Sequence, residues 1–262
     1  MSDLEYSPVE IMTVAAARKL KNGTVCFVGI GLPSAAANLA RITHAPDLVL
    51  IYESGTIGAK PDVLPLSIGD GDLAETADTV VSVPEIFRYW LQGGRVDIGF
   101  LGAAQIDKFG NINTTVIGPY DAPRVRLPGA GGAPEIATAA KEIAIILKQS
   151  KRAFVDKLDF VTSSGRYPNS NGNGKPNSRG RGPTTVITDL GIMRSDPASG
   201  ELVLTTIHPG ISVEQVREST GWLLKVAPAM ETTPRPSASE LVALRDLHAR
   251  TAAAHGNAEA TE

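Results

Sequence analysis

Hydrophobic residues follow two alternating patterns along this chain. Near its start, Ser7, Pro8 and Glu10 form a capping box with proline at the first helical position, and apolar residues then recur at helical spacing. Short continuous apolar runs predict strands that are buried on both faces. Strands are predicted at 24–28, 48–52, 79–83, 97–102 and 143–147, and helices at 8–22, 34–42 and 84–92. This alternation of strands and helices predicts an α/β layered domain.

The last third of the chain adds antiparallel strands to the sheet. Two runs, 185–193 and 202–207, are predicted to pair through the turn sequence 196–200. The predicted fold class is therefore α/β, with a layered open mixed sheet flanked by helices.

Two further capping boxes predict helices near the C-terminus. The capping pairs are Ser212 with Gln215 and Ser237 with Glu240. We expect a main domain over residues 1–232, followed over 233–262 by a C-terminal helix and a tail that frays from Ala252.

The segment 163–183 interrupts the hydrophobic pattern. It is rich in Gly, Asn, Ser and Pro and predicts a long, mobile surface loop. Its four basic residues, with no acidic residue between them, are Arg166, Lys175, Arg179 and Arg181. The loop is interpreted as a solvated insertion, because long polar loops usually tolerate change. The alternative is a lid that closes over an anionic ligand.

Composition excludes several partners. The 25 basic and 28 acidic residues give a net charge of -3, which provides no positive field for a nucleic-acid backbone. No apolar stretch approaches the roughly 20 residues that cross a bilayer. Residues 1–6 carry two acids and no apolar run, unlike a secretory signal, so we expect a cytoplasmic protein.

The cysteine and histidine residues predict neither a disulfide nor a metal site. Cys26 is the single cysteine and lies in an apolar run, so a buried small side chain is favoured over a catalytic thiol. The four histidines have no ligand spacing, and no C-x-x-C or H-E-x-x-H occurs. We therefore predict no metal site.

Glu53 stands where a predicted buried strand ends. It follows the run 48–52 and precedes Ser54 and Gly55. Ligands bind at the carboxyl edge of open α/β sheets, where a carboxylate can be a base, a metal ligand or a nucleophile. Position alone leaves a structural alternative open, in which Glu53 caps a turn or pairs with a surface lysine.

Two glycine clusters place backbone N–H groups at strand or helix ends. Gly29 and Gly31 follow the first predicted strand, and 129–132 precedes a helix predicted to begin near Pro134. Such amides can hold an anion or a developing oxyanion. Both clusters also occur in ordinary turns. The chain lacks the G-x-G-x-x-G and G-x-S-x-G motifs of nucleotide binding and serine hydrolysis.

Five motifs, which follow one another between about residues 7 and 224, resemble those of a known family. They are 28–33 (V-G-I-G-L-P), 52–55 (Y-E-S-G), 101–107 (L-G-A-A-Q-I-D), 109–113 (F-G-N-I-N) and 129–133 (G-A-G-G-A). Together they resemble the class I CoA-transferases, and most closely the β subunit of glutaconate CoA-transferase. The similarity weakens in the Asn-rich loop and in the tail.

The resemblance implies a site as well as a fold. The E-S-G glutamate of that family is the catalytic nucleophile, which implies this role for Glu53. Its glycine loops line the acyl and CoA thioester site, which implies Gly29, Gly31, Gly131 and Gly132. Gln105 is a further candidate that either assists or only packs. Asn111 and Asn113 are instead expected to fix a turn, since Asn is common there and tolerates left-handed backbone conformations.

A carboxylate suits the implied chemistry. Its attack on a thioester gives a mixed anhydride, which CoA reopens to a glutamyl-CoA thioester, so the acyl-group energy is conserved. The tetrahedral steps develop a negative oxygen that backbone amides can stabilise. The substrates would be acyl-CoA and a carboxylic acid, with no cofactor.

The resemblance also implies a partner. Its branch of the family uses a separate α subunit, so we expect a hetero-oligomer and an inactive lone chain. Two alternatives remain: a CoA-ester or ring-opening hydrolase on the same fold, and a non-catalytic acyl-CoA-binding module. The presence of Glu53 argues against both, because hydrolytic relatives tend to lack it and a binder needs no nucleophile. The acid is left open among glutaconate, 3-oxoadipate and related dicarboxylates or 3-oxo acids.

Overall fold

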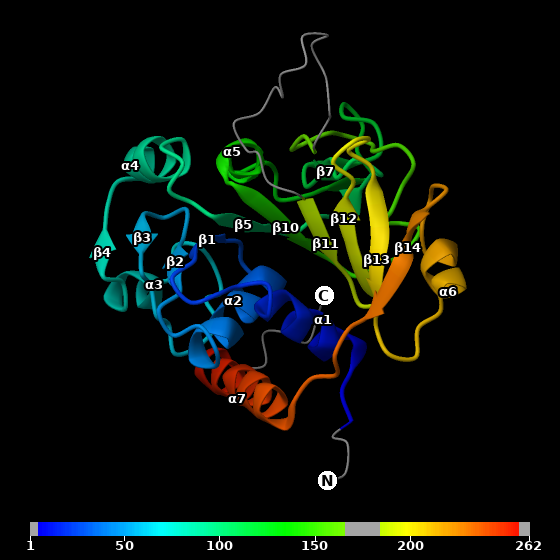
Figure 1. The fold of residues 1–262 in the computed structure, drawn as a ribbon. Coiled ribbons are helices and arrows are strands. Elements are labelled where there is room, and N and C mark those ends of the chain that lie inside the picture. Colours follow the sequence, from blue (N-terminus) through cyan, green and yellow to red (C-terminus); the bar gives the residue numbers. More distant parts are fainter. Residues whose placement is uncertain (1–4, 166–183, 257–262) are drawn as a thin grey trace.

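A ten-stranded mixed sheet forms the centre of the computed structural model, which describes residues 5–165 and 184–256 (Figure 1). Its strand order is β14-β13-β12-β11-β10-β5-β1-β2-β3-β4. The strands are β1 (Val25–Val28), β2 (Val49–Ile51), β3 (Thr56–Ile57), β4 (Thr79–Val80), β5 (Ile98–Leu101), β10 (Glu142–Ile146), β11 (Thr184–Ile187), β12 (Gly191–Ser195), β13 (Leu202–Ile207) and β14 (Lys225–Thr232). The predicted open mixed sheet is confirmed.

Helices cover both faces of this sheet, as predicted. Figure 1 shows α1, α2 and α7 on one side and α5 on the other. The helices are α1 (Pro8–Ala17), α2 (Leu32–Ile42), α3 (Gly71–Glu75), α4 (Val83–Glu85), the π-helix η1 (Ile86–Leu91), α5 (Ala133–Ala139), α6 (Val213–Glu218) and α7 (Ala238–His255). Two small hairpins, β6 (Gln105–Ile106) with β7 (Ile112–Asn113) and β8 (Val116–Ile117) with β9 (Val125–Arg126), complete the fold. No helix in the described ranges is long and apolar enough to cross a membrane.

The middle of the sheet is parallel, and this decides where a site can form. Strands β2, β1, β5, β10 and β11 pair in parallel in that spatial order, whereas the pairs β2–β3, β3–β4, β11–β12 and β12–β13 are antiparallel. Because the five parallel strands run the same way, their carboxyl ends share one edge of the sheet.

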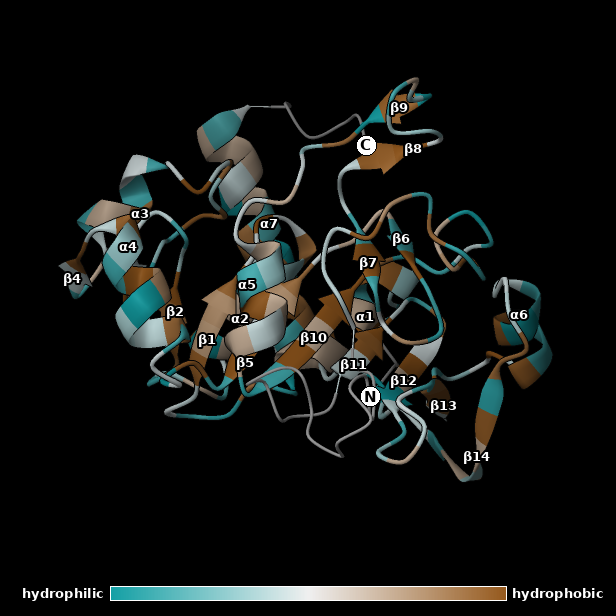
Figure 2. Cartoon of the chain, turned by 90° about the horizontal axis from the view of Figure 1, so that it is seen from above, coloured by the Kyte–Doolittle hydropathy of each residue, from teal (hydrophilic) through white to brown (hydrophobic). Residues whose placement is uncertain are grey.

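The apolar runs form strands that are buried on both faces. In β1, Cys26 and Val28 join the core beneath α1 and α2, while Phe27 joins the core on the opposite face. The central strands are accordingly mostly brown, the hydrophobic end of the scale, in Figure 2. Burial raises the pKa of the Cys26 thiol, which has no exposed surface, so the prediction of a buried small side chain is confirmed.

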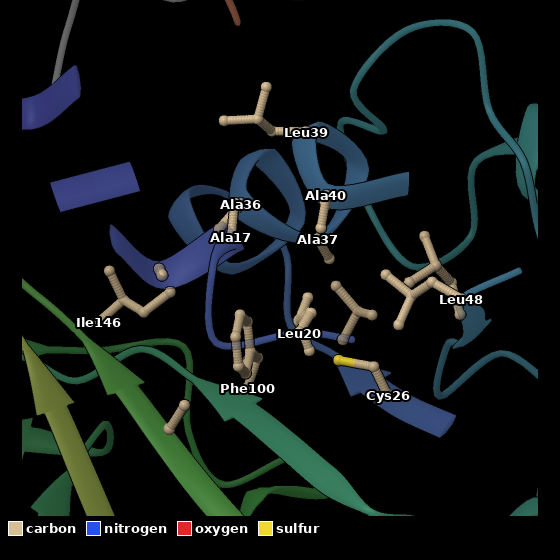
Figure 3. Packing of buried hydrophobic residues seen from close by; sticks show 14 of the residues in the cluster. Ala17, Leu20, Cys26, Ala36, Ala37, Leu39, Ala40, Leu48, Phe100 and Ile146 are labelled. Carbon is tan, nitrogen blue, oxygen red and sulfur yellow. The ribbon is translucent and has the colours of Figure 1, made fainter. Parts of the chain in front are cut away.

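Helix α2 approaches the sheet closely because its inner positions are small. Its Ala36, Ala37 and Ala40 are fully buried and lie near Leu20 and Phe100 in Figure 3. Alanine in these positions lets the backbone of α2 lie near α1 and β1 without voids. The start of α2 is thereby held at a fixed place beside the carboxyl edge of the sheet.

The C-terminal helix is tied to the N-terminal one. Arg18 forms an ion pair with Glu240 at 2.7 Å, and Arg245 forms another with Glu10 at 2.6 Å. Helix α7 runs to His255, past Ala252, where a frayed tail was expected to begin. Two side chains near its end bind the backbone of Leu64: Thr251 Oγ1 accepts from the Leu64 N–H at 2.9 Å, and His255 Nε2 lies 3.2 Å from the Leu64 carbonyl oxygen.

One predicted strand was wrong, because the run 185–193 forms two strands. The chain turns at Thr188, whose Oγ1 accepts hydrogen bonds from the N–H of Leu190 at 3.1 Å and of Gly191 at 3.0 Å. The second strand, β12, then pairs with β13 in the antiparallel sense that was predicted. The turn residues Thr188, Asp189 and Gly191 stand inside the run, and the prediction passed over them because apolar residues lie on both sides.

Three other boundaries differ from the prediction. The run 79–83 contributes only the exposed two-residue edge strand β4. The predicted helix 84–92 is one α-helical turn followed by the π-helix η1. The edge strand β14 has no continuous apolar run and contains Pro228, so it was not predicted. The basic loop lies mostly outside the described residues, where Arg166, Lys175, Arg179 and Arg181 all fall.

Candidate active site

Glu53 lies in a tight turn at the carboxyl end of β2, as predicted. The turn is closed by backbone bonds, since the N–H of Gly55 donates to the carbonyl of Tyr52 at 3.0 Å. Gly55 has a φ of +107°, and a Cβ there would lie 2.0 Å from the carbonyl oxygen of Val81. Only glycine fits this position, because both the backbone conformation and the neighbouring chain exclude a side chain.

Strand alternation decides which way Glu53 faces. Leu50 and Tyr52 belong to the core on the α2 side, and Ile51 belongs to the core on the other side. The period of two continues to Glu53, which therefore faces α5 and η1. A Cβ on Gly132, at the start of α5, would lie 3.2 Å from its carboxyl carbon.

The carboxylate of Glu53 is half-buried and unpaired. Within residues 5–165 and 184–256, no side chain or backbone group forms a hydrogen bond or ion pair with it. It does not cap the turn, which backbone bonds already close, and it pairs with no lysine of the described ranges. The structural alternative raised by its sequence position is therefore not what the structure shows.

The second glycine cluster packs directly against this carboxylate. A Cβ on Gly131 would lie 3.5 Å from Oε2 of Glu53, and the loop is anchored by bonds from the Gly129 N–H to the Thr114 carbonyl (2.8 Å) and from Thr114 Oγ1 to the Gly129 carbonyl (2.7 Å). In the described part of the chain, the N–H groups of Gly131 and Gly132 have no backbone acceptor. The loop thus lies against the nucleophile candidate and carries two N–H groups without a backbone acceptor.

The first glycine cluster lies at the same sheet edge, but its two glycines differ. Phe27 pairs with Ile51 in register, which places Gly29 level with Glu53 on the neighbouring strand. The Gly29 N–H already donates to the Phe100 carbonyl at 3.1 Å, so it cannot also bind an anion. Gly31 is exposed and caps α2, and its own N–H has no backbone acceptor among the described residues.

A buried hydrogen bond that the sequence did not reveal ties the two motifs together. The Tyr52 hydroxyl lies 3.2 Å from Ser34 Oγ, and Asn38 Nδ2 donates to both oxygens. All three residues are almost fully buried, and burial raises the pKa of Tyr52. Because Ser34 belongs to the first turn of α2, this contact fixes the Gly31 turn relative to the strand that carries Glu53.

Gln105 is held by its neighbours. Its Oε1 accepts hydrogen bonds from Asn113 Nδ2 (2.8 Å) and from the Asp159 N–H (3.2 Å), and its Nε2 donates to the Asp159 carboxylate (3.0 Å). These bonds give Gln105 a packing role in the β6–β7 region. A part in ligand binding stays a prediction.

Asn111 and Asn113 fix turns, as predicted. Asn113 Oδ1 accepts from the N–H groups of Thr115 and Val116, and Asn111 Nδ2 donates to Asp107. No non-glycine residue in the described ranges has a positive φ, so these side chains act through hydrogen bonds and not through left-handed backbone.

Phe87 is a site neighbour that the sequence analysis missed. A Cβ on Gly132 would lie 2.6 Å from its Cζ atom, and its ring packs against Phe27 at a centroid distance of 5.9 Å. An aromatic residue in a predicted helix gives no signal of such a contact, because only the tertiary fold brings η1 to α5.

Among the described residues, neither a cluster of metal ligands nor the cavity beside β14 involves Glu53. In the described ranges, no group of three or more His, Cys, Asp or Glu residues is arranged to hold a metal ion. One cavity lies between β12, β13 and β14, where it is lined by Arg194, Lys225 and Val226 among others. That cavity includes none of the predicted site residues.

Comparison with known proteins agrees with this fold. The family model described as Coenzyme A transferase matches residues 9–219. The chain therefore belongs to the coenzyme A transferase family, which confirms the resemblance found in its motifs.

Two relatives show which members of the family the chain resembles. The chain is 66% identical over 251 residues to the B subunit of 3-oxoadipate CoA-transferase from Pseudomonas knackmussii, covering 96% of each protein. It is 38% identical over 246 residues to the B subunit of glutaconate CoA-transferase from Acidaminococcus fermentans, covering 90% of this chain and 91% of that protein. The crystal structure of glutaconate CoA-transferase from the same organism superposes with a TM-score of 0.83 at 33% identity, over 92% of this chain and 94% of that one.

Proposed function

We propose that this chain is the glutamate-bearing subunit of an acid:acyl-CoA CoA-transferase. The observation that carries the proposal is the carboxylate of Glu53, which has no partner among the described residues and lies against Gly131 and Gly132, whose N–H groups have no backbone acceptor there. A carboxylate without a partner is available as a nucleophile, and the neighbouring amides suit an oxyanion. The similarity to proteins named as B subunits supports assembly with an A-type subunit.

The proposed reaction passes CoA through Glu53 in two half-reactions. The carboxylate attacks the acyl-CoA carbonyl, the C–S bond breaks, and CoA leaves as a thiolate, so that Glu53 and the acyl group form a mixed anhydride. The thiolate then attacks the glutamyl carbonyl and releases the donor acid as its carboxylate, so that Glu53 carries CoA as a thioester. The acceptor acid reverses these steps with its own carboxylate.

The acid is proposed to be a dicarboxylic or 3-oxo acid. The names of the two relatives refer to 3-oxoadipate and glutaconate, both of which are dicarboxylates. The proposal includes a cytoplasmic location, where CoA and its esters are available, and no cofactor. The partner subunit is expected to contribute to the choice of acid.

Trapping the intermediate tests the proposal. The chain, co-expressed with its A-type subunit, is incubated with acyl-CoA in the absence of an acceptor acid. We expect mass spectrometry to find CoA on the peptide that contains Glu53, in a form that hydroxylamine converts to a hydroxamate and borohydride reduces. An adduct on another residue would contradict the assignment. Free acid and CoA released at the full rate would show a hydrolase, and bound but unchanged acyl-CoA would show a binding module.

Replacing Gly132 by alanine tests the role of the glycine loop. Its φ of -84° and ψ of -1° suit any residue, so the effect comes from the new methyl group, which would press on Phe87 and on the Glu53 carboxyl. We expect CoA transfer to fall about a hundredfold, since small displacements of a reacting group are that costly. Steady-state rates of the complex measure this effect.

Gly71→Ala is the matched control for Gly132→Ala. Gly71 also lies at a helix start, and a Cβ there would meet no atom within 4 Å. We expect this variant to keep wild-type transfer. Equal rates for the two variants would show that the glycine loop does not confine Glu53.

A further inference from the structure

The π-helix η1 presents Phe87 to the site. The N–H of Gln92 donates to the Phe87 carbonyl at 2.8 Å, and the N–H of Arg95 donates to the Trp90 carbonyl at 2.9 Å, both five residues back. Such wide turns are rare and occur frequently at functional sites. The extra residue in the turn changes which side chains face inward, and here Ile86 and Leu91 are fully buried while Phe87 lies at the rim.

Phe87 and Glu53 meet at the same point of the glycine loop. The position that a Cβ of Gly132 would occupy lies 2.6 Å from Phe87 Cζ and 3.2 Å from Glu53 Cδ. The absence of a side chain on Gly132 therefore lets the ring edge approach the carboxyl group. Phe87 forms an apolar wall on that side of the nucleophile.

This wall is held from two directions. The Phe87 ring packs against Phe27 of β1 with an interplanar angle of 51°. Behind it, Gln92 Nε2 donates to Glu135 Oε1 at 2.9 Å, which joins the end of η1 to α5. The ring is thus fixed relative to both the sheet and the glycine loop.

A glutamyl-CoA thioester needs protection on its carbonyl carbon. The acceptor carboxylate must attack this carbon for transfer. If a water oxygen attacks it instead, the C–S bond breaks, CoA leaves as the thiol with a proton from water, and the Glu53 carboxylate returns. Both reactions use the same atom, so access to it decides between them.

We infer that Phe87 is a specificity-determining residue that excludes water from the thioester on Glu53 and so favours transfer over hydrolysis. This inference rests on the proposed function. The ring offers no hydrogen bond to orient a water molecule, and it occupies one side of the carbonyl carbon where water would otherwise approach. Loss of its volume should leave the nucleophile in place and open that side.

The test measures the lifetime of the thioester. The complex is loaded with acyl-CoA, freed of small molecules by rapid gel filtration, and sampled for protein-bound CoA. We expect Phe87→Ala to shorten the lifetime about tenfold and to raise acyl-CoA hydrolysis without acceptor by about the same factor, since lost water exclusion permits side reactions. Phe87→Leu, which keeps most of the volume, should stay within about threefold of wild type.

Two controls make the result specific. Tyr89 lies on the same π-helix with 57% of its surface exposed, and Tyr89→Ala should leave the lifetime unchanged. Phe87→Val replaces the alanine variant if that variant fails to assemble. A wild-type lifetime in Phe87→Ala or Phe87→Val, with transfer alone reduced, would overturn the inference and leave Phe87 a packing role. A wild-type complex that forms no thioester on Glu53 would overturn the proposed function and this inference with it.

Discussion

Replacing Glu53 by alanine or glutamine is expected to abolish CoA transfer while the complex still assembles. The side chain lies at a strand end, is half-buried and makes no hydrogen bond or ion pair in the described part of the chain, so its removal costs the fold little. In the proposed mechanism, in contrast, no other residue carries the acyl group or CoA. Loss of a covalent nucleophile typically lowers turnover by about a thousandfold or more.

The measurement is the rate of acyl-CoA exchange by the purified complex, alongside its melting temperature. Glu75→Gln is a suitable control, because Glu75 is an exposed acid on α3 and the same change of charge is made away from the site. The control should exchange CoA at the wild-type rate. A Glu53 variant that retains more than a few per cent of activity would remove Glu53 from the mechanism, and one that fails to assemble would give it a structural role.

Gly55→Ala is expected to have the largest effect on stability. Its φ of +107° is unfavourable for alanine, and the new Cβ would stand 2.0 Å from the Val81 carbonyl oxygen, a backbone atom that cannot move alone. The backbone strain costs about 1–2 kcal/mol and the overpacking about 1–3 kcal/mol. We expect the melting temperature to fall by about 5–10 °C, since 1 kcal/mol corresponds to about 2–4 °C in a domain of this size.

Gly94→Ala separates the cost of backbone strain from the cost of overpacking. Gly94 also has a positive φ, of +72°, but a Cβ there would meet no atom within 4 Å. This variant should show only the strain and lose about half as much stability as Gly55→Ala. Calorimetry of the two variants measures the difference. Equal losses would mean that the turn carrying Glu53 can move away from Val81, and that the contact between them does not fix the site.

Local sequence signals predicted the elements that depend on local interactions. The box of Ser7 and Glu10 opens α1 as expected, and that of Ser237 and Glu240 opens α7, because capping satisfies backbone groups within one turn. Local signals also indicated three of the candidate site residues. Glu53 ends a run of apolar residues, and Gly131 and Gly132 precede a helix, so each motif could be placed at an element boundary.

Contacts between distant segments could not be predicted in the same way. Strand β14, for example, forms only because β13 offers it an edge. The bond between Tyr52 and Ser34 joins residues that are neighbours only after β2 and α2 have packed. Each is a tertiary interaction that overrides or supplements a weak local preference.

The sequence by itself therefore determined the fold class and the family, and it predicted Glu53 as the candidate nucleophile, because buried apolar runs and ordered motifs are written along the chain. Only the tertiary structure decided what surrounds that carboxylate. Strand alternation turned Glu53 toward α5, and sheet pairing committed the Gly29 N–H to Phe100. The π-turn then brought Phe87 to the glycine loop. The physical reason is that neighbours in space decide where a side chain points, whether its N–H groups are already bonded and what it contacts. The order of residues alone does not give these neighbours.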